Sequence, residues 1–335
     1  MYKESRFPRI VSRHKKIAHI LCEKLGNFTE IRTFARNIRQ AASQCPTQWT
    51  LPKQEEAGTF LKSATAEAHI PHTSMKKVKV VIPFYKEQLK DWEQCALDNT
   101  MRTLSSHPIV FLKPEGMSIE QVAKAYPQAE QMEVSSEWLG LENGIAGYNR
   151  MMMSAEFYQM FADTEYILIC HLDAWIFRDE LLEWCAAGYD LVAAPWPLRP
   201  RYTRFPLKQW LLLKRWLTAS KGNTRIQMFG RIGNGGLCLR KVSAFEAACR
   251  RYAKEIEHYL SRKGDGLYNE DLFWALVPEG MNHPSVETAL RFSYDLKPAL
   301  CHQLNRNRLP MGCHGFMHKS RVAFWKPFIP CIGNT

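Results

Sequence analysis

The sequence of 335 residues contains no long hydrophobic run. Its longest apolar stretches, such as 166–170 and 191–195, are far shorter than the roughly 18 residues needed to cross a bilayer, so no transmembrane helix is predicted. The N-terminus is basic, but His-Lys-Lys-Ile at 14–17 stands where a signal peptide would need an uninterrupted apolar region. We therefore expect a cytoplasmic protein.

The sequence also lacks paired cysteines. Its 10 cysteines are scattered without CxxC pairs or regular spacing, which argues against a zinc ribbon or a disulfide framework and favours reduced, structural thiols. No GxGxxG follows the first predicted strand, where Pro83-Phe84-Tyr85 stands instead, and this disfavours a dehydrogenase. No helix-turn-helix, zinc-finger or RNA-recognition signature is present, so no nucleic-acid partner is expected.

The composition bounds the fold and the partners. With 46% hydrophobic and 12% aromatic residues, the chain can bury one large core with a modest appendage. It carries 45 Lys and Arg against 33 Asp and Glu, a formal net charge of +12, so its surface attracts polyanions. Nucleotides, acidic glycans, lipid head groups and nucleic acid all satisfy that condition, and composition does not choose among them.

The pattern of apolar residues divides the chain in two. Residues 1–75 read as a helical N-terminal extension, and 76–330 as the main domain, where short apolar runs alternate with helical stretches. This order predicts an α/β fold with a mixed, mostly parallel sheet flanked by helices, whose ligand site lies at the carboxyl ends of its strands. We expect strands at 78–83, 108–112, 131–134, 166–170 and 189–194, and helices at 87–105, 118–125 and 144–161.

The segment His171-Leu172-Asp173 directly follows the expected buried strand 166–170. A carboxylate at the carboxyl end of such a strand faces the ligand crevice. Its oxygens suit Mn²⁺ or Mg²⁺, which can bridge the two phosphates of a nucleotide-sugar. The alternative is that Asp173 caps a helix beginning near Arg178, and position alone leaves both interpretations open.

Three later segments add candidate groups. The turn 233–236, Gly-Asn-Gly-Gly, precedes a strand at 237–241 and indicates either a close backbone approach or an ordinary tight turn. Glu270 and Asp271 open an apolar helix, where they could complement its dipole or take a proton from an attacking hydroxyl. His314 lies in a predicted loop between Gly312 and Gly315, where core packing explains a histidine poorly. A neutral imidazole is a common metal ligand, so His314 is a candidate ligand, whereas His318 is expected at the surface.

The order of these segments resembles an uncharacterised bacterial family of glycosyltransferase-like domains of the GT-A, Rossmann-like type. It is more distantly similar to the β-1,4-galactosyltransferases and the polypeptide GalNAc-transferases. The resemblance covers roughly 78–326. It implies metal-dependent transfer of a hexose, with inversion, from a nucleotide-sugar, with a UDP-sugar favoured. The implied acceptor is a glycan or a lipid-linked molecule, in the synthesis of a surface polysaccharide or lipopolysaccharide.

The resemblance also assigns metal ligands. It makes Asp173 the last residue of an Asp-x-Asp motif in which His171 replaces the first aspartate. Met311 and His314 match a Met-x-x-His element, and of these two His314 is the better candidate ligand for Mn²⁺ or Mg²⁺. Because His171 has replaced an acid, a catalytically inactive protein that binds a sugar or a nucleotide is the main alternative function.

The remaining site residues follow from the same resemblance. Asp271 is the expected base, with Glu270 binding the sugar or the acceptor, although these two roles could be exchanged. Arg150 is an expected donor contact or, equally, a solvated helix residue. The expected donor-binding residues are Pro83, Tyr85, Asn149, Arg150, His171, Asp173, Gly235 and Gly236.

Residues 199–217 mix tryptophan, leucine and basic residues. This mixture is typical of a peripheral membrane contact. It is also typical of a helix packed on the core whose lysines reach out to water, and this second interpretation is the one we favour from the sequence.

Overall fold

The computed structural model describes residues 76–140, 142–218, 223, 225–262 and 265–333. The predicted extension 1–75 lies outside the described residues, so its helical character stays a prediction. The strands are β1 Lys76–Pro83, β2 Ile109–Pro114, β3 Glu130–Val134, β4 Thr164–Cys170, β5 Ala174–Ile176, β6 Leu191–Ala193, β7 Leu237–Lys241, β8 Ser293–Tyr294 and β9 Gly312–His314.

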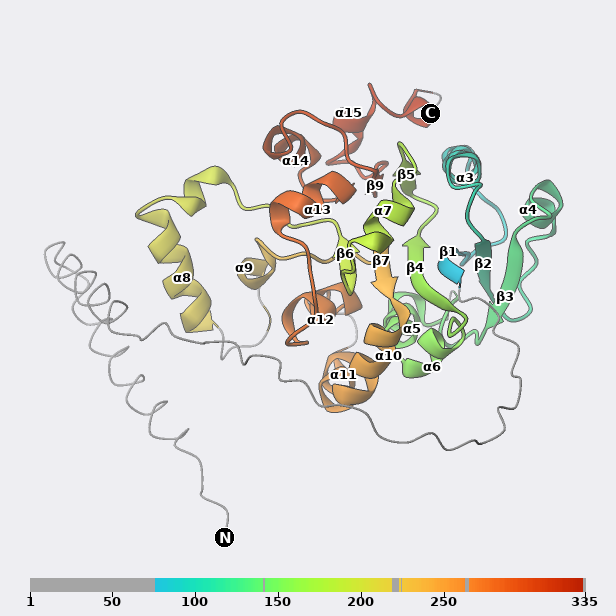
Figure 1. Cartoon of the computed structure of the whole chain (residues 1–335), viewed down its shortest axis with the longest axis horizontal. Coiled ribbons are helices and arrows are strands. Elements are labelled where there is room, and N and C mark those ends of the chain that lie inside the picture. The colour runs from blue at the N-terminus through green and yellow to red at the C-terminus, as the bar shows by residue number, and fades with distance from the viewer. Residues whose placement is uncertain (1–75, 141, 219–222, 224, 263–264, 334–335) are drawn as a thin grey trace, which may run out of the picture. The chain divides into compact units, whose positions relative to one another are not determined.

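Helices and short 3-10 turns connect the strands (Figure 1). None of the described helices is long and apolar enough to span a membrane. They are α3 Asp91–Thr103, α4 Glu120–Ala125, α5 Gly144–Met152, α6 Ala155–Gln159, α7 Leu181–Ala186, η1 Pro200–Thr203, α8 Leu207–Thr218, α9 Arg225–Met228, α10 Val242–Arg251, α11 Ala253–Ser261, α12 Glu270–Leu276, α13 Val286–Phe292, α14 Pro298–Leu304, α15 Val322–Trp325 and η3 Pro330–Ile332.

The main sheet has six strands in the order β3-β2-β1-β4-β7-β6. Strands β1 to β4 pair in parallel, and β7 pairs antiparallel with both β4 and β6. Among the described strands of this sheet, only β7 therefore runs against the others. This arrangement confirms the predicted mixed, mostly parallel sheet flanked by helices.

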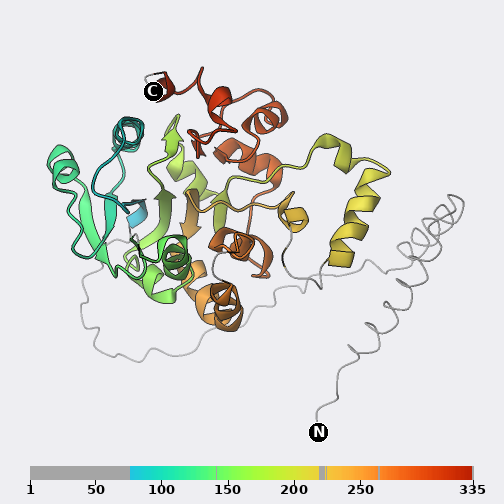
Figure 2. The ribbon, with the colours of Figure 1, turned by 180° about the vertical axis from the view of Figure 1, so that it is seen from behind.

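Helices cover both faces of the main sheet, as the two opposite views show (Figures 1 and 2). Side chains alternate between the faces along a strand: Ile167 and Ile169 join the core cluster formed with α5, α6, α10 and α12. Tyr166 and Leu168 join a second cluster, formed with α3 and α7. Because β4 is buried on both faces, it reads in sequence as a continuous apolar run, and the prediction of a central strand there is confirmed.

A second, small sheet has the order β5-β9-β8. It was not predicted, because strands of two or three residues are too short to show a period. The expected single helix over 144–161 is in fact two, α5 and α6. They are separated at Ser154, whose hydroxyl accepts a hydrogen bond from the Phe157 amide and caps α6.

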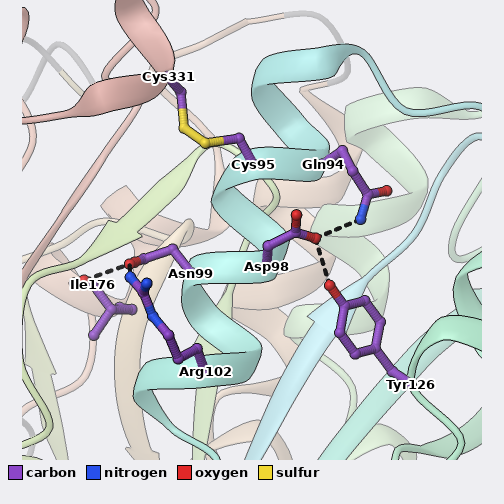
Figure 3. The surroundings of a disulfide bond; sticks show 8 residues. All are labelled: Gln94, Cys95, Asp98, Asn99, Arg102, Tyr126, Ile176 and Cys331. Carbon is purple, nitrogen blue, oxygen red and sulfur yellow. Dashed lines mark hydrogen bonds between the residues drawn. A yellow bond between two sulfur atoms is a disulfide. The ribbon is translucent and has the colours of Figure 1, made fainter.

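Cys95 in α3 forms a disulfide bond with Cys331 in η3 (Figure 3). The prediction of reduced thiols is wrong for this pair. The two residues are 236 positions apart, with 6.1 Å between their Cα atoms, so no local spacing could have indicated the bond. The other described cysteines are free and buried. The disulfide fastens the C-terminal segment to α3.

Candidate functional site

The predicted site residues gather around one hollow of about 450 Å³. The hollow lies where β1 and β4 end and where α12 begins. Every predicted site residue lines it except Asp173 and Arg150. The predicted residues that line it are Pro83, Tyr85, Asn149, His171, Gly235, Gly236, Glu270, Asp271 and His314.

Asp173 and His314 lie together at the edge of this hollow. Strand β5 pairs antiparallel with β9 so that Ala174 is opposite His314, and His314 Nε2 lies 3.1 Å from Asp173 Oδ1. His171 completes a group whose possible ligand atoms all lie within 4.8 Å of one another. Asp173 does not cap the next helix, which was the alternative role. That helix, α7, begins eight residues later at Leu181, and it is Asp179 Oδ1 that accepts a hydrogen bond from the Leu181 amide, at 3.0 Å.

The charges of these three residues are interdependent. Burial, together with His314 nearby, lowers the pKa of His171 to about 4, so His171 is neutral at pH 7. Burial alone would raise the pKa of Asp173 and lower that of His314, but the ion pair between them outweighs burial. It holds the pKa of Asp173 well below its usual range, and with Asp295 it raises the pKa of His314 to about 10.

This donor set fits a divalent cation. One carboxylate and two imidazoles are ligands that Mn²⁺ accepts, and the half-buried Asp173 and His171 supply one of each. His314 Nε2, which faces Asp173, would have to release its proton before it could bind a cation. A hydrogen bond of 2.8 Å between His171 Nε2 and the Tyr148 hydroxyl fixes the orientation of the His171 ring.

The turn 233–236 brings the backbone close to two site residues. A Cβ atom at Gly235 would collide with the Glu270 carboxylate, and one at Gly236 would collide with the His314 ring. The side chain of Asn234 holds the turn, because its Oδ1 accepts from the amides of Gly236 at 3.0 Å and of Leu237 at 3.1 Å. Of the two interpretations, the structure therefore supports a close backbone approach.

Glu270 and Asp271 are adjacent but differ in environment. Glu270 is buried, and its Oε2 accepts from Arg240 Nη2 at 2.8 Å. Asp271 is half-buried, and burial together with Glu270 raises its pKa to about 7. Near neutral pH, Asp271 is therefore close to half-ionised, as a proton acceptor in catalysis needs to be.

The residues predicted to contact the donor are not equally placed. Asn149 connects α5 with α12, because its Oδ1 accepts from the Glu270 amide and its Nδ2 donates to Asn269 Oδ1, both at 3.1 Å. Arg150 is exposed and borders a separate hollow, so the structure does not bring it to the site. Met311 is fully buried in the core, and His318 is exposed as expected.

Sequence reasoning missed several residues that hold the site. Asp295 Oδ1 lies 3.5 Å from His314 Nδ1 and also pairs with the guanidinium of Arg321. Tyr148 contacts His171, and Arg240 holds Glu270. Of these residues, only Tyr148 had a local signal in the sequence, because it directly precedes the predicted donor-binding residue Asn149 on α5. Asp295 and Arg321 come from segments without a recognisable pattern.

The family described as "Protein of unknown function (DUF5672)" matches residues 128–314, more than half of the chain. The chain belongs to this family. The matched range begins near β3 and ends at His314. It therefore includes all the residues of the site described above that have a carboxylate or an imidazole, namely His171, Asp173, Glu270, Asp271, Asp295 and His314. Among curated proteins, no sequence matches.

Solved structures similar to this chain include three glycosyltransferases. The bifunctional glycosyltransferase WbbM has 15% identity and a TM-score of 0.48, over 79% of this chain and 51% of its own. Galactosyltransferase LgtC, in complex with donor and acceptor sugar analogs, has 14% identity and a TM-score of 0.46, over 76% and 95%. Core-mannan synthase A from Aspergillus fumigatus, in its Mn/GDP form, has 12% identity and a TM-score of 0.37, over 65% and 73%.

All three TM-scores lie below 0.5, so the argument for a function rests on the residues of the site.

Proposed function

We propose that this protein is a metal-dependent glycosyltransferase that moves a sugar from a nucleotide-sugar to an acceptor hydroxyl. One observation carries the proposal. One hollow is lined by His171, His314 and the half-buried Asp271, whose pKa is raised to about 7, and Asp173 at its edge completes a His-Asp-His group with ligand atoms within 4.8 Å. The His-Asp-His group suits a cation on a diphosphate, and Asp271 suits a base that activates an acceptor.

Asp173 and His314, with His171 beside them, are the residues that would hold Mn²⁺ or Mg²⁺. When bound, such a cation would neutralise the charge of the departing nucleoside diphosphate. Asp295 Oδ1 lies 3.5 Å from His314 Nδ1, the ring nitrogen that faces away from Asp173, and a carboxylate there is the kind of outer contact that orients a metal-binding imidazole. The neutral state of His171 supports its role as a third ligand or as a donor contact.

The environments of the two carboxylates support Asp271 as the base. Glu270 is already engaged by Arg240, so its charge is compensated and its lone pairs are partly used. Asp271 is free to accept a proton from the acceptor hydroxyl while that oxygen bonds to the anomeric carbon. The bond from that carbon to the diphosphate breaks at the same time, and this single displacement inverts the configuration.

The resemblance supplies the finer parts of the proposal. Pro83 and Tyr85 would border the nucleotide base, and Gly235 and Gly236 would lie beneath the transferred sugar. The donor would be a UDP-hexose, and the acceptor a glycan or a lipid-linked molecule. The place of action would be the cytoplasmic side of a bacterial membrane, in the synthesis of a surface polysaccharide.

The test is donor binding and hydrolysis by the purified full-length protein. UDP-, GDP- and CMP-sugars are titrated by calorimetry with and without Mn²⁺, against Asp173→Asn and a control, Glu287→Gln, at an exposed carboxylate of α13. We expect one donor to bind only with Mn²⁺, and this binding to be lost in Asp173→Asn alone.

The outcomes separate the alternatives. Slow release of the free sugar that depends on Asp271 supports a transferase. Metal-dependent binding without any turnover in the presence of acceptors supports the inactive binding protein. If no donor binds while both variants remain folded by circular dichroism, the proposal is wrong.

A further inference from the structure

Helix α8 and the turn η1 before it form an exposed surface of apolar and basic residues, which we call the α8 surface (residues 199–217). Both ribbon views place α8 at the periphery, away from the main sheet (Figures 1 and 2). The prediction that this helix packs on the core with its lysines reaching out is wrong, because only Leu211 of α8 is buried.

The inward side of α8 is narrow. Leu211 is buried, and Arg215, one turn later, donates hydrogen bonds to the carbonyl oxygens of Ile226, at 3.2 Å, and of Phe229. These contacts attach one side of α8 to the segment around α9. On its other sides, the helix is contacted by η1, where Tyr202 stacks on Trp210, but most of its side chains there are exposed.

Large apolar side chains gather on this surface. Of the eleven large hydrophobic side chains that are exposed in the described chain, seven lie within 205–217. Their clustering is what matters, since single exposed apolar residues are ordinary. They are Phe205, Leu207, Trp210, Leu212, Leu213, Trp216 and Leu217.

The charge of the same segment is of one sign. Between Asp190 and Glu246 the sequence has eleven Lys and Arg and no acidic residue, in a chain whose net charge is +12. Within 199–217, five basic side chains are exposed and none forms an ion pair with another described residue. They are Arg199, Arg201, Arg204, Lys208 and Lys214.

The aromatic residues are arranged among these cations. Lys214 Nζ lies 4.8 Å from the centre of the Trp210 ring, and Trp210 stacks with Tyr202 at 6.4 Å. A neighbouring hollow of about 500 Å³ is lined by Arg199, Arg201 and Lys297, with no acidic residue. Indole and phenol rings beside cations are the groups that favour the head-group layer of a bilayer.

We propose that the α8 surface docks this protein on a membrane that carries anionic lipids. The leucines and tryptophans would enter the boundary between head groups and acyl chains while the basic side chains contact lipid phosphates. The hollow beside Arg199 would receive a head-group phosphate. Exposed leucines favour a bilayer over a nucleic acid, since base stacking and phosphate contacts make no use of Leu212, Leu213 or Leu217.

The proposal does not depend on the glycosyltransferase activity, and its test measures binding alone. The full-length protein is sedimented with vesicles of phosphatidylcholine, or of phosphatidylcholine with about 30% phosphatidylserine, at two salt concentrations. We expect binding to the anionic vesicles only, weakened by salt.

Matched variants locate the surface. Lys208→Glu should weaken vesicle binding about tenfold, whereas Lys254→Glu, at an exposed lysine of α11, should not change it. Leu212→Ser, at a side chain 53% exposed, should also weaken binding, and its control is Leu182→Ser, at a side chain 54% exposed on α7. Circular dichroism shows whether each variant is folded.

Three results would overturn the proposal. The first is an absence of binding to anionic vesicles, or binding that all four variants share equally. The second is Lys208-dependent binding of single-stranded RNA without vesicle binding, which would indicate a nucleic-acid surface. The third is a change from dimer to monomer in Leu212→Ser without vesicle binding, which would assign the surface to a second copy of the chain.

Discussion

His314 Nε2 and Asp173 Oδ1 lie 3.1 Å apart although 141 positions separate them in the sequence. The pairing of β5 with β9 sets this distance, since it puts His314 opposite Ala174. Two strands of three residues each thus align the two main candidate metal ligands. A cation would replace an existing ion pair there, so the site is held in shape before any cation binds.

Replacing His314 should weaken metal binding more than replacing a neighbouring histidine. We expect His314→Gln to lower the affinity for Mn²⁺ by at least about 10- to 100-fold, because a ligand is lost. The control is His318→Gln, since His318 is exposed and its ring hydrogen-bonds Ser320 rather than a residue of the site. Mn²⁺ titration followed by electron paramagnetic resonance measures both. Equal affinities in the two variants would contradict a role of His314 as a ligand.

The glycine turn should tolerate no side chain. We expect Gly236→Ala to displace the His314 ring, and Gly235→Ala to displace the Glu270 carboxylate. Each should cost about 1–3 kcal/mol in the free energy of unfolding, and Gly236→Ala should also weaken Mn²⁺ binding.

The control for both is Gly266→Ala, because a Cβ there meets nothing within 4 Å. Urea unfolding measures stability. If Gly236→Ala matches Gly266→Ala in both stability and Mn²⁺ binding, the close approach does not constrain the site.

Much of the main sheet could be predicted because each strand left a local signal. Strand β4 is buried on both faces and reads as an apolar run, and the residues after it necessarily lie at the strand's carboxyl end. This is why Asp173 and His171 were found. The turn 233–236 and the pair of acids at the start of α12 were also local signals.

The rest depended on contacts between distant segments. Asp295 and Arg321 reach the site through β8 and a C-terminal loop that have no periodicity. The Cys95–Cys331 bond joins residues 236 positions apart. For α8, the sequence showed an amphipathic, basic helix in either interpretation, and only the exposure of most of its side chains in the structure decided between them.

The disulfide should stabilise the fold. We expect reduction, or the double change Cys95→Ser with Cys331→Ser, to lower the free energy of unfolding by about 2–4 kcal/mol, since the bond closes a long loop. Thermal unfolding with and without dithiothreitol measures this. The double variant is the control, because its melting temperature should not respond to the reductant. A wild-type protein that also fails to respond would contradict the prediction.

The buried pair of Arg240 and Glu270 should be strongly coupled. Both side chains are almost fully buried, and Arg240 also donates to the Tyr158 hydroxyl at 2.8 Å. We expect Arg240→Met to cost about 3–5 kcal/mol, because it leaves the Glu270 charge without a partner. Adding Glu270→Gln to that variant should recover part of the loss. Urea unfolding of the two single variants and the double variant measures the coupling, and additive losses would contradict it.

As the pH rises, ionisation of Asp271 should lower the free energy of unfolding and raise the activity. Its pKa is raised from 3.8 to about 7 in the folded protein, first by burial and then by Glu270. The folded state therefore holds this proton more tightly than the unfolded state. The stability that the neutral carboxyl contributes is fully present below about pH 4 and is lost as the pH rises through 7.

Asp271→Asn keeps an uncharged side chain at every pH, and its oxygen can still accept from the Leu272 amide, which lies 2.8 Å from Asp271 Oδ1. We expect this variant to gain about 1–3 kcal/mol over the wild type between pH 4 and pH 8. Its turnover should fall at least about 100-fold, because the base is lost.

In the wild type, turnover should rise with pH and level off above about 7. Urea unfolding and initial rates over this range test both parts. A stability difference that does not change with pH would contradict the raised pKa, whereas a variant that keeps its turnover would remove Asp271 as the base and direct attention to Glu270.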